Sequence, residues 1–319
     1  HGKNHHLDGT FGQHVHSLRL LLPDGDVLNC SSTENSALFH ATCGGMGLTG
    51  IIVDATLHLR RIPGSAIHQR TLRSPHLQDV MERFEASAAS TYSVAWLDCL
   101  ASGAALGRSL LFLGEHATDG QFKAPQRGGL AVPFNSPAFL LNRYSMGLFN
   151  ALYYNRPVNS QAEQRIEAGQ YFFPLDSIAH WNRLYGRNGF LQYQFVVPDA
   201  AALPAITLVL QRSSAAGKGS FLSVLKKFGP GNANLLSFPI QGYTLAMDFK
   251  FENTLLPLLN ELDSIVLDHG GRLYLAKDAR MSEVTFKRSY PRWEELAQLR
   301  AASGADRLFN SLQSRRLGL

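Results

Sequence analysis

Hydrophobic and polar residues alternate near the start of the chain in a pattern that predicts a β-hairpin. Positions 15–22 alternate and are rich in leucine, and a second short apolar segment covers positions 27–30. Between them lies Pro23-Asp24-Gly25-Asp26, which favours a tight turn because Asp binds nearby backbone amides and Gly adopts left-handed conformations. We therefore expect two antiparallel strands joined by this turn.

A short helix, a glycine-rich loop and a strand should complete this first module. Ser32 or Thr33 can cap the helix, because a hydroxyl at that position accepts a backbone N–H of the first turn. The loop covers residues 43–50, and β-branched residues then alternate through 51–62. Pro63-Gly64-Ser65 should end the module.

The rest of the chain predicts an α+β fold. A helix is expected at 77–89, strands at 92–97 and 109–113, and a long, mostly irregular segment at 117–156, which is rich in Gly, Pro and Asn. The later elements are expected as a strand at 190–197, a helix at 200–212, strands at 221–225 and 243–249, a helix at 255–269 and a strand at 272–275. That order is typical of a ferredoxin-like βαββαβ unit with an antiparallel sheet. The tail after Tyr290 should be helical.

The composition excludes several classes of protein. The chain has 319 residues, enough for about two domains, and 45% of them are hydrophobic while 17% are charged, as in a packed globular protein. No apolar run approaches the roughly 18 residues of a membrane-spanning helix. The net charge of +5 comes from scattered basic residues, so we predict no nucleic-acid partner.

The spacing of cysteines and histidines indicates neither a disulfide framework nor a metal site. Cys30, Cys43 and Cys99 form no CxxC pair, and Cys99 should be a core residue. The first sixteen residues hold five histidines, but no HExxH motif or paired cysteine accompanies them. Because the chain starts without methionine or a signal-peptide pattern, we expect the natural protein to have a further segment upstream of His1.

The glycine-rich loop contains Gly45-x-Gly47-x-x-Gly50, the spacing of a dinucleotide-binding fingerprint. In that fingerprint, the glycines follow a strand and begin a helix, and an acidic residue comes about 20 positions later. Here a helix precedes the glycines, a strand follows them, and the acidic residue is missing. Two interpretations remain. The loop is a tight turn without a special function, or its glycines let backbone N–H groups approach the phosphates or the ring of a ligand.

Two polar side chains stand where the last expected strand passes into a loop. Tyr274 and Lys277 occupy this position, and a lysine there could hold a substrate oxyanion or tune a nearby base. The alternative is a surface salt bridge in this segment, in which Asp278 pairs with Lys277 or with Arg280. The carboxylates of Asp98, Asp248 and Asp278 all lie near expected strand ends, where most such residues only cap or turn the chain.

Blocks of sequence spread in order along nearly the whole chain form a more specific pattern than any single motif. They are His1-Gly2-Lys3-Asn4-His5-His6, Gly9-Thr10-Phe11-Gly12, Phe39-x-Ala41-Thr42-x-Gly44-Gly45-x-Gly47-Leu48-Thr49-Gly50-Ile51-Ile52, Trp181-Asn182-Arg183-x-Tyr185-Gly186, Gly189-Phe190-Leu191-Gln192-Tyr193-Gln194-Phe195, Phe228-Gly229-Pro230, Leu236-Ser237-Phe238-Pro239-Ile240 and Gly270-Gly271-Arg272-Leu273-Tyr274-x-Ala276-Lys277-Asp278. The pattern resembles the FAD-linked oxidases of the vanillyl-alcohol-oxidase and para-cresol-methylhydroxylase superfamily.

The resemblance implies a partial FAD-binding domain of the PCMH type and a substrate, or cap, domain. Residues 1–63 would form the second part of the FAD-binding domain, 64–289 the cap domain, and 290–319 a helical tail that returns to the FAD-binding domain. The family's pyrophosphate-binding subdomain would lie upstream of His1. We therefore expect the full-length protein to bind FAD, and this fragment to bind it weakly or not at all.

The resemblance also implies which residues face the cofactor and the substrate. His1 would stand beside the isoalloxazine ring as a catalytic and cofactor-binding residue, with Gly2 close to it, and Tyr274 would approach the flavin from the cap side. The other implied residues are Met46, Gly47 and Ile52 at the ADP end of the cofactor, and Lys277, Gln194, Lys226 and Trp96 around the substrate. No metal is implied.

A few positions depart from the family pattern. Ala246 stands where some members have cysteine, and Thr244 stands in place of asparagine. Phe172-Phe173 replaces a Tyr-His pair. These changes remove polar groups from the pocket, so they bear on the identity of the sugar and not on the flavin chemistry.

The activity implied by the resemblance is oxidation of a secondary sugar hydroxyl, with hydride passing to flavin N5 while a base accepts the hydroxyl proton. The implied substrate is a polyprenyl-phosphate pentose oxidised at its 2-hydroxyl, a cell-wall precursor whose epimerisation an NAD(P)H-dependent reductase would finish. The alternatives are a soluble alditol or hydroxy-acid oxidase of the same superfamily, and a non-catalytic flavoprotein remnant that binds a glycolipid or a protein. The implied location is the cytoplasm or the periphery of the inner membrane.

Overall fold

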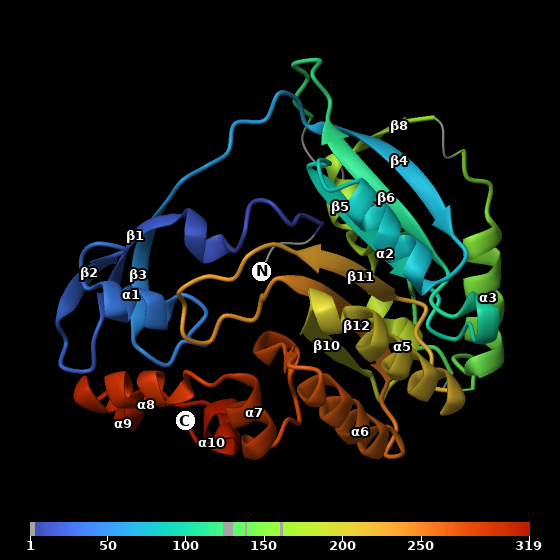
Figure 1. Cartoon of the computed structure of the whole chain (residues 1–319). Helices are drawn as coiled ribbons and strands as arrows, with labels where there is room; N and C mark the ends of the chain where they lie inside the picture. The colour runs from blue at the N-terminus through green and yellow to red at the C-terminus, as the bar shows by residue number, and fades with distance from the viewer. Residues whose placement is uncertain (1–3, 124–129, 138, 160–161) are drawn as a thin grey trace.

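The computed structural model describes residues 4–123, 130–137, 139–159 and 162–319. The fold is α+β, and a small sheet, a large sheet and a group of C-terminal helices pack together (Figure 1). Figure 1 shows the small sheet at the left, the large sheet at the right and the C-terminal helices in red at the bottom.

The small sheet has the strand order β2-β1-β3. Its elements are β1 (Val15–Leu21), β2 (Val27–Ser31), β3 (Ile51–Leu57) and the adjacent helix α1 (Ser36–Thr42). The antiparallel pairing of β1 with β2 confirms the hairpin prediction, and Leu18 and Leu20 pack against Phe39 of the helix. β3 is shorter than the expected strand over 51–62, and all of its residues are exposed on the outer edge of the sheet.

Helix α1 begins later than the sequence indicates. Its N-cap is Asn35 in a left-handed conformation, and not Ser32 or Thr33. The hydroxyl of Ser31 accepts the backbone N–H groups of Thr33 and Glu34 at 3.2 and 3.0 Å. These residues are therefore used in a turn that ends before the helix begins.

The large sheet contains eight antiparallel strands in the order β13-β10-β12-β11-β5-β6-β4-β8. They are β4 (Ala66–Ser74), β5 (Tyr92–Leu97), β6 (Ser109–His116), β8 (Gln164–Glu167), β10 (Phe190–Pro198), β11 (Ser223–Phe228), β12 (Gly242–Lys250) and β13 (Arg272–Leu273). The sequence did not predict β4 or β8. A separate two-stranded parallel pair joins β7 (Leu130–Ala131) to β9 (Ile178–Ala179).

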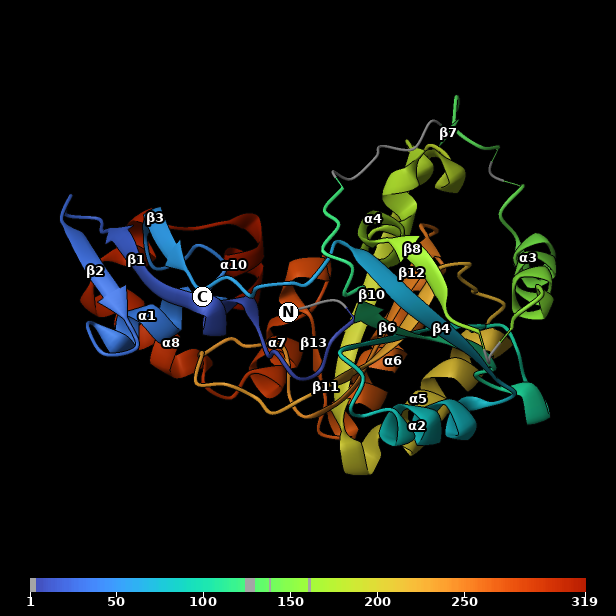
Figure 2. The same cartoon turned by 90° about the horizontal axis from the view of Figure 1, so that it is seen from above.

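Helices cover one face of the large sheet (Figure 2). They are α2 (Leu77–Ala86), α5 (Asp199–Ala215) and α6 (Leu255–Asp268). From β10 onward, the chain runs β10, α5, β11, β12, α6, β13, which is the expected order of strand, helix, strand, strand, helix, strand. Tyr193, Phe195 and Val197 of β10 join the main hydrophobic core under these helices. Because side chains alternate along a strand, Gln192 and Gln194 point to the opposite face.

Much of the described part of the segment 117–156 lacks regular secondary structure, as its composition predicts, but the segment also holds an unexpected helix. This helix is α3 (Arg143–Asn155), and the side chain of Asn142 caps it by accepting the backbone N–H groups of Tyr144 and Ser145. Near the end of the same region, α4 (Ala168–Phe172) packs on the face of the sheet that the other helices leave uncovered.

The C-terminal tail is helical, as expected, and packs against the N-terminal module. It contains α7 (Glu283–Ser289), α8 (Trp293–Ala302), α9 (Ala305–Leu308) and α10 (Leu312–Leu317). Arg300 of α8 is buried, and its Nε donates to the backbone oxygen of Leu48 in the glycine-rich loop at 3.1 Å. This contact joins the end of the chain to its beginning.

Candidate active site

A cavity of about 890 Å³ lies on the face of the large sheet opposite α2, α5 and α6. Side chains of β5, β6, β10, β11 and β12 form its floor, and residues of α4 and the C-terminal end of α3 form part of its wall. The size is that of a site for a small-molecule substrate. We take this cavity as the candidate active site.

The register of the strands places four cavity residues in one row across the floor. Gln194 of β10 lies opposite Ala246 of β12, which lies opposite Val224 of β11, which in turn lies opposite Trp96 of β5. All four line the cavity. The row brings together Gln194 and Trp96, two of the residues singled out in the sequence, with Ala246 between them.

A second row on the same face carries Lys226. Lys226 of β11 lies opposite Thr244 of β12, and its side chain is buried. Gln194 donates from Nε2 to the hydroxyl of Thr244 at 3.1 Å. Thr244 therefore orients Gln194, while Lys226 brings a positive charge to the cavity wall.

A third row contains a polar pair that sequence reasoning missed. Gln192 donates from Nε2 to Oδ1 of Asp248 at 2.7 Å, and both residues line the cavity. The sequence places Asp248 near a strand end, as a capping residue, but β12 continues to Lys250 and Asp248 lies inside the strand. A carboxylate in the middle of an apolar strand was the available signal, since such a group is buried only at a cost.

Tyr274 and Lys277 close one end of the cavity. The backbone N–H of Tyr274 donates to the carbonyl oxygen of Gln194 at 2.9 Å, and its ring stacks on Phe238 with centroids 4.4 Å apart. A single 3₁₀ turn, Leu275–Lys277, then carries Lys277 to the cavity. The two residues expected at a strand end are thus joined in space to the row that contains Gln194.

The alternative interpretation of Lys277, a surface salt bridge with its neighbours, does not describe the structure. Oδ1 of Asp278 accepts the backbone N–H groups of Arg280 and Met281, and Oδ2 pairs with Arg316. Asp278 is therefore a turn residue, as the sequence indicated. Within the described part of the chain, Lys277 forms no ion pair.

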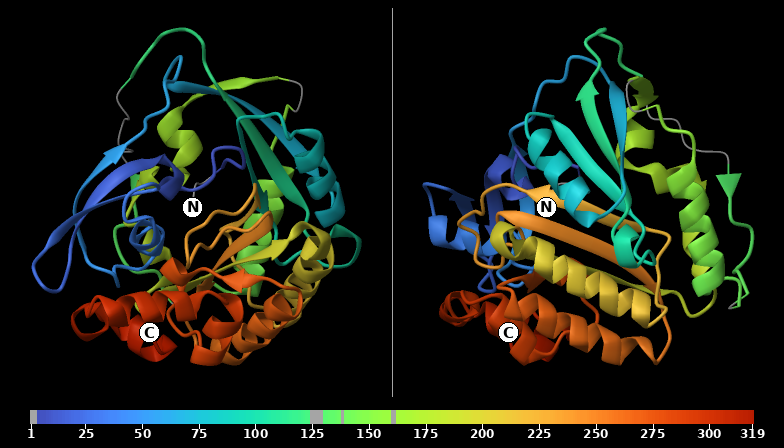
Figure 3. Two further views of the ribbon diagram at one scale, coloured as in Figure 1. Left: turned by 60° about the vertical axis from the view of Figure 1, so that its left-hand side comes forward. Right: turned by 45° about the vertical axis from the view of Figure 1, so that its right-hand side comes forward.

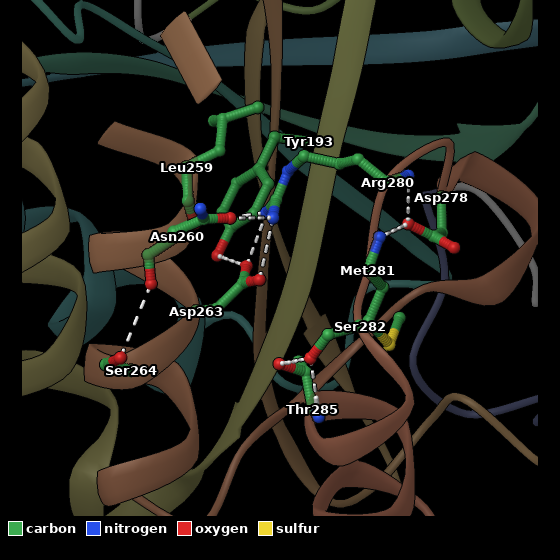
Figure 4. A network of polar contacts seen from close by, with 10 residues as sticks. All are labelled: Tyr193, Leu259, Asn260, Asp263, Ser264, Asp278, Arg280, Met281, Ser282 and Thr285. Atoms are coloured by element: carbon green, nitrogen blue, oxygen red, sulfur yellow. Dashed lines mark hydrogen bonds and ion pairs between the residues drawn. The ribbon is translucent and has the colours of Figure 1, made fainter. Parts of the chain in front are cut away.

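A buried network holds the turn that follows Lys277 (Figure 4). The guanidinium of Arg280 donates to both carboxylate oxygens of Asp263 at 2.6 and 2.9 Å, and to Oδ1 of Asn260 at 2.8 Å. The hydroxyl of Tyr193 donates to the same carboxylate at 3.1 Å. Burial raises the pKa of Asp263 above its usual value, although Arg280 acts in the opposite direction.

Arg156 brings another positive charge to the opposite wall of the cavity. It follows the last residue of α3, and its guanidinium lies over the ring of Tyr153, 4.1 Å from the centroid, and over the ring of Phe112 at 5.5 Å. All three residues line the cavity, as do Phe172 and Trp96. Aromatic rings thus surround the guanidinium, an arrangement that leaves its outer donors free to bind an anion.

The residues expected at the ADP end of the cofactor lie in the N-terminal module, outside the cavity. Met46 has a left-handed backbone with φ 59°, Gly47 has φ 73°, and Ile52 belongs to the exposed strand β3. A Cβ at Gly45 would lie 2.0 Å from the carbonyl oxygen of Ala41, whereas a Cβ at Gly47 would meet nothing within 4 Å. Gly45 therefore serves the tight turn, and the loop at Gly47 borders open space.

The loop 229–240 connects α1, the helix before the glycine-rich loop, to the cavity. Leu235 donates its backbone N–H to the carbonyl oxygen of His40 at 3.3 Å, and Asn234 bonds to the His40 ring at 2.9 Å. Phe238, further along the loop, stacks on Tyr274. His1 and Gly2, the other residues expected at the flavin, lie outside the described residues.

Replacing Ala246 by cysteine should make the cavity reactive toward small alkylating reagents, because the new thiol would stand on its floor. The natural protein should not react there. Cys30 and Cys99 are buried, and burial raises the pKa of the Cys99 thiol to about 12. Peptide-level mass spectrometry of Ala246→Cys with a haloacetamide checks this, because it separates the cavity peptide from that of the half-buried Cys43, with Cys99 as internal control. Equal labelling of a cavity peptide in the unsubstituted protein would contradict it.

The chain is similar to decaprenylphosphoryl-β-D-ribose oxidase of Mycolicibacterium smegmatis, with 39% identity over 335 residues that cover 100% of this chain and 72% of that protein. It is 32% identical over 338 residues to an uncharacterised protein of Streptomyces coelicolor, covering 100% of this chain and 90% of the relative. A stretch of 60 residues, 19% of this chain and 11% of the relative, is 42% identical to D-arabinono-1,4-lactone oxidase of Yarrowia lipolytica. No model of a protein family matches the chain.

Proposed function

The chain belongs to the family of FAD-linked oxidoreductases that includes decaprenylphosphoryl-β-D-ribose oxidase, and we propose that it oxidises a secondary hydroxyl of a sugar carried on a polyprenyl phosphate. Its relatives are named as oxidases and FAD-linked oxidoreductases, which supports an FAD-dependent oxidase. The observation that supports the substrate is the cavity, in which amides, a carboxylate and cations line one space with aromatic rings.

The polar floor suits a sugar. Gln192 with Asp248, and Gln194 with Thr244, present paired donors and acceptors, which match the hydroxyl groups of a pentose. Lys226 and Arg156 supply positive charge for the phosphate, because both line the same cavity. A polyprenyl chain is too long to be enclosed there, so it would leave through the rim.

Lys277 would act on the reacting hydroxyl. It lies at the cavity end next to Tyr274, and within the described residues no carboxylate pairs with it. An unpaired ammonium group there would stabilise negative charge on the hydroxyl oxygen as its proton passes to a base. FAD, when bound, supplies the acceptor for the hydride. We propose His1 as a second residue at the reacting centre.

The cofactor would extend from Tyr274 toward the N-terminal module. Met46, Gly47 and Ile52 would hold its ADP end, and Gly2 would lie at the ring. The exposed apolar strand β3 and the open space at Gly47 support this direction. The loop 229–240, which contacts both α1 and Tyr274, would form the base of the site.

The domain division follows from the same proposal. Residues 1–63 would belong to the FAD-binding domain and 64–289, with the ferredoxin-like unit, to the cap domain. The tail 290–319 would return to the first of these, and its contact through Arg300 to the glycine-rich loop supports that assignment. An NAD(P)H-dependent reductase would be the partner that reduces the keto-sugar.

The described part of the chain includes no helix with both the length and the hydrophobicity needed to span a membrane. We propose a location at the membrane periphery or in the cytoplasm, because a polyprenyl phosphate is held in a bilayer by its chain.

The test is bleaching of enzyme-bound FAD without oxygen. A polyprenyl-phosphoryl pentose should bleach the flavin, and a free pentose or an alditol should not, because neither offers a phosphate to Lys226 and Arg156. Rapid bleaching by an alditol would instead assign the protein to the alditol oxidases. Tightly bound FAD that no sugar reduces would identify a non-catalytic remnant.

A further inference from the structure

Helix α3 exposes an apolar stripe. Tyr144, Leu148 and Leu152 are spaced by four residues, so they lie on one side of the helix, and they are 79%, 63% and 65% exposed. The inward side carries Met146 and Asn150, and the buried amide of Asn150 donates to Asp98 at 2.8 Å. A surface helix ordinarily buries its apolar stripe and exposes its polar side, and α3 does the opposite.

The residues before α3 enlarge this stripe into a patch. Six large apolar residues of α3 and of the turn that precedes it are exposed, and we call them the apolar α3 surface: Phe139, Leu140, Tyr144, Leu148, Phe149 and Leu152. Figure 3 shows α3 along the outer side of the molecule, away from the small sheet. An exposed apolar patch of this kind marks a contact with a membrane or another protein.

The charge around the patch distinguishes between these partners. From residue 120 to residue 162 the sequence contains no Asp or Glu and four basic residues. Among them, Arg143 is exposed in the first turn of α3. Two copies of such a surface would repel each other, whereas an anionic bilayer attracts basic residues while its acyl region accepts apolar side chains.

We propose that the apolar α3 surface docks on an anionic lipid bilayer. The side chains of Tyr144, Leu148 and Leu152 would enter the interface, and Arg143 would bind a lipid phosphate. The C-terminal end of the same helix reaches the cavity, since Tyr153 and Arg156 line it. Docking would therefore bring the cavity rim to the membrane, and the passage of a lipid-linked sugar from bilayer to cavity rests on the function proposed above.

The experiment measures cosedimentation of the FAD-loaded protein with vesicles of phosphatidylcholine alone, or with phosphatidylglycerol added. We expect binding to the anionic vesicles and about tenfold weaker binding after Tyr144→Ser, Leu148→Ser and Leu152→Ser together, because each side chain loses apolar burial. High salt should also weaken binding. The matched control is Leu308→Ser with Leu312→Ser, two exposed leucines of the C-terminal helices.

Flavin absorbance and thermal unfolding establish that each variant is folded. The triple variant should oxidise a short-chain, water-soluble sugar phosphate like the unsubstituted protein, and lose activity only on substrate embedded in vesicles. Absent vesicle binding, or binding that the triple substitution leaves unchanged, would overturn the proposal. A dimer that the triple substitution dissociates, without vesicle binding, would assign the surface to a second copy. Vesicle binding without any sugar oxidation would uphold the docking surface and reject the function.

Discussion

Substitution of Lys277 by methionine should slow substrate-driven reduction of FAD by about 100- to 1,000-fold, the range found when one group that stabilises a developing oxyanion is removed. Lys277 stands at the cavity end beside Tyr274, and methionine keeps its length while removing its charge. Rapid-mixing measurements of flavin bleaching at saturating substrate would give the rate. Binding of FAD and the unfolding temperature should be unchanged, because this ammonium forms no ion pair within the described part of the chain.

Lys287→Met is the matched control. Lys287 lies on α7 and pairs with Glu283 one turn away on the surface. Its substitution should leave the rate within about twofold, since a solvent-exposed pair contributes little free energy. If Lys277→Met reduced FAD as fast as this control, the lysine would have no part in the reaction.

Asp263→Ala should destabilise the protein by about 3–5 kcal/mol, because it leaves the guanidinium of Arg280 buried without its carboxylate. Asp263 receives hydrogen bonds from Arg280 and Tyr193, and both partners are largely buried. Urea unfolding followed by circular dichroism measures the change in the free energy of unfolding.

Asp268→Ala on the same helix is the control. Asp268 pairs with Arg288 on the surface, where both side chains are more than half exposed, so the expected loss is below about 1 kcal/mol. A cost for Asp263→Ala no larger than this would show that the buried network contributes no net stability.

The sequence predicted those elements in which turn and cap residues mark the ends and apolar residues face the core. The turn at Asp24-Gly25 fixed the first hairpin, and Gly270, with φ 70°, follows the end of α6 as a glycine after a helix should. Helix α3 was missed because apolar residues lie on both its inward and its outward side, which weakens the periodic signal of an amphipathic helix. The surrounding segment is also rich in Gly, Pro and Asn, which favour loops.

The candidate site was predicted in part, for a similar reason. Gln194, Lys226, Tyr274, Lys277 and Trp96 were singled out through the resemblance and meet in one cavity. Arg156 was not, because it lies far away in sequence at the end of the unpredicted helix. No local pattern reports that Arg156 packs over Phe112 of β6 in the wall of the same cavity.

The order of strands in the large sheet has a consequence for synthesis. β5 pairs with β11, so Trp96 gains its cross-strand partner Val224 only after β11 has been synthesised. Likewise, β10 has a neighbour on both sides only after β12 and β13 have been synthesised. A nascent chain that has completed β4, β5 and β6 presents β5 as an open edge, the feature by which partly folded chains aggregate. We therefore expect ribosome-bound chains that stop before residue 242 to engage chaperones, and the cavity to form only when almost the entire protein has left the ribosome.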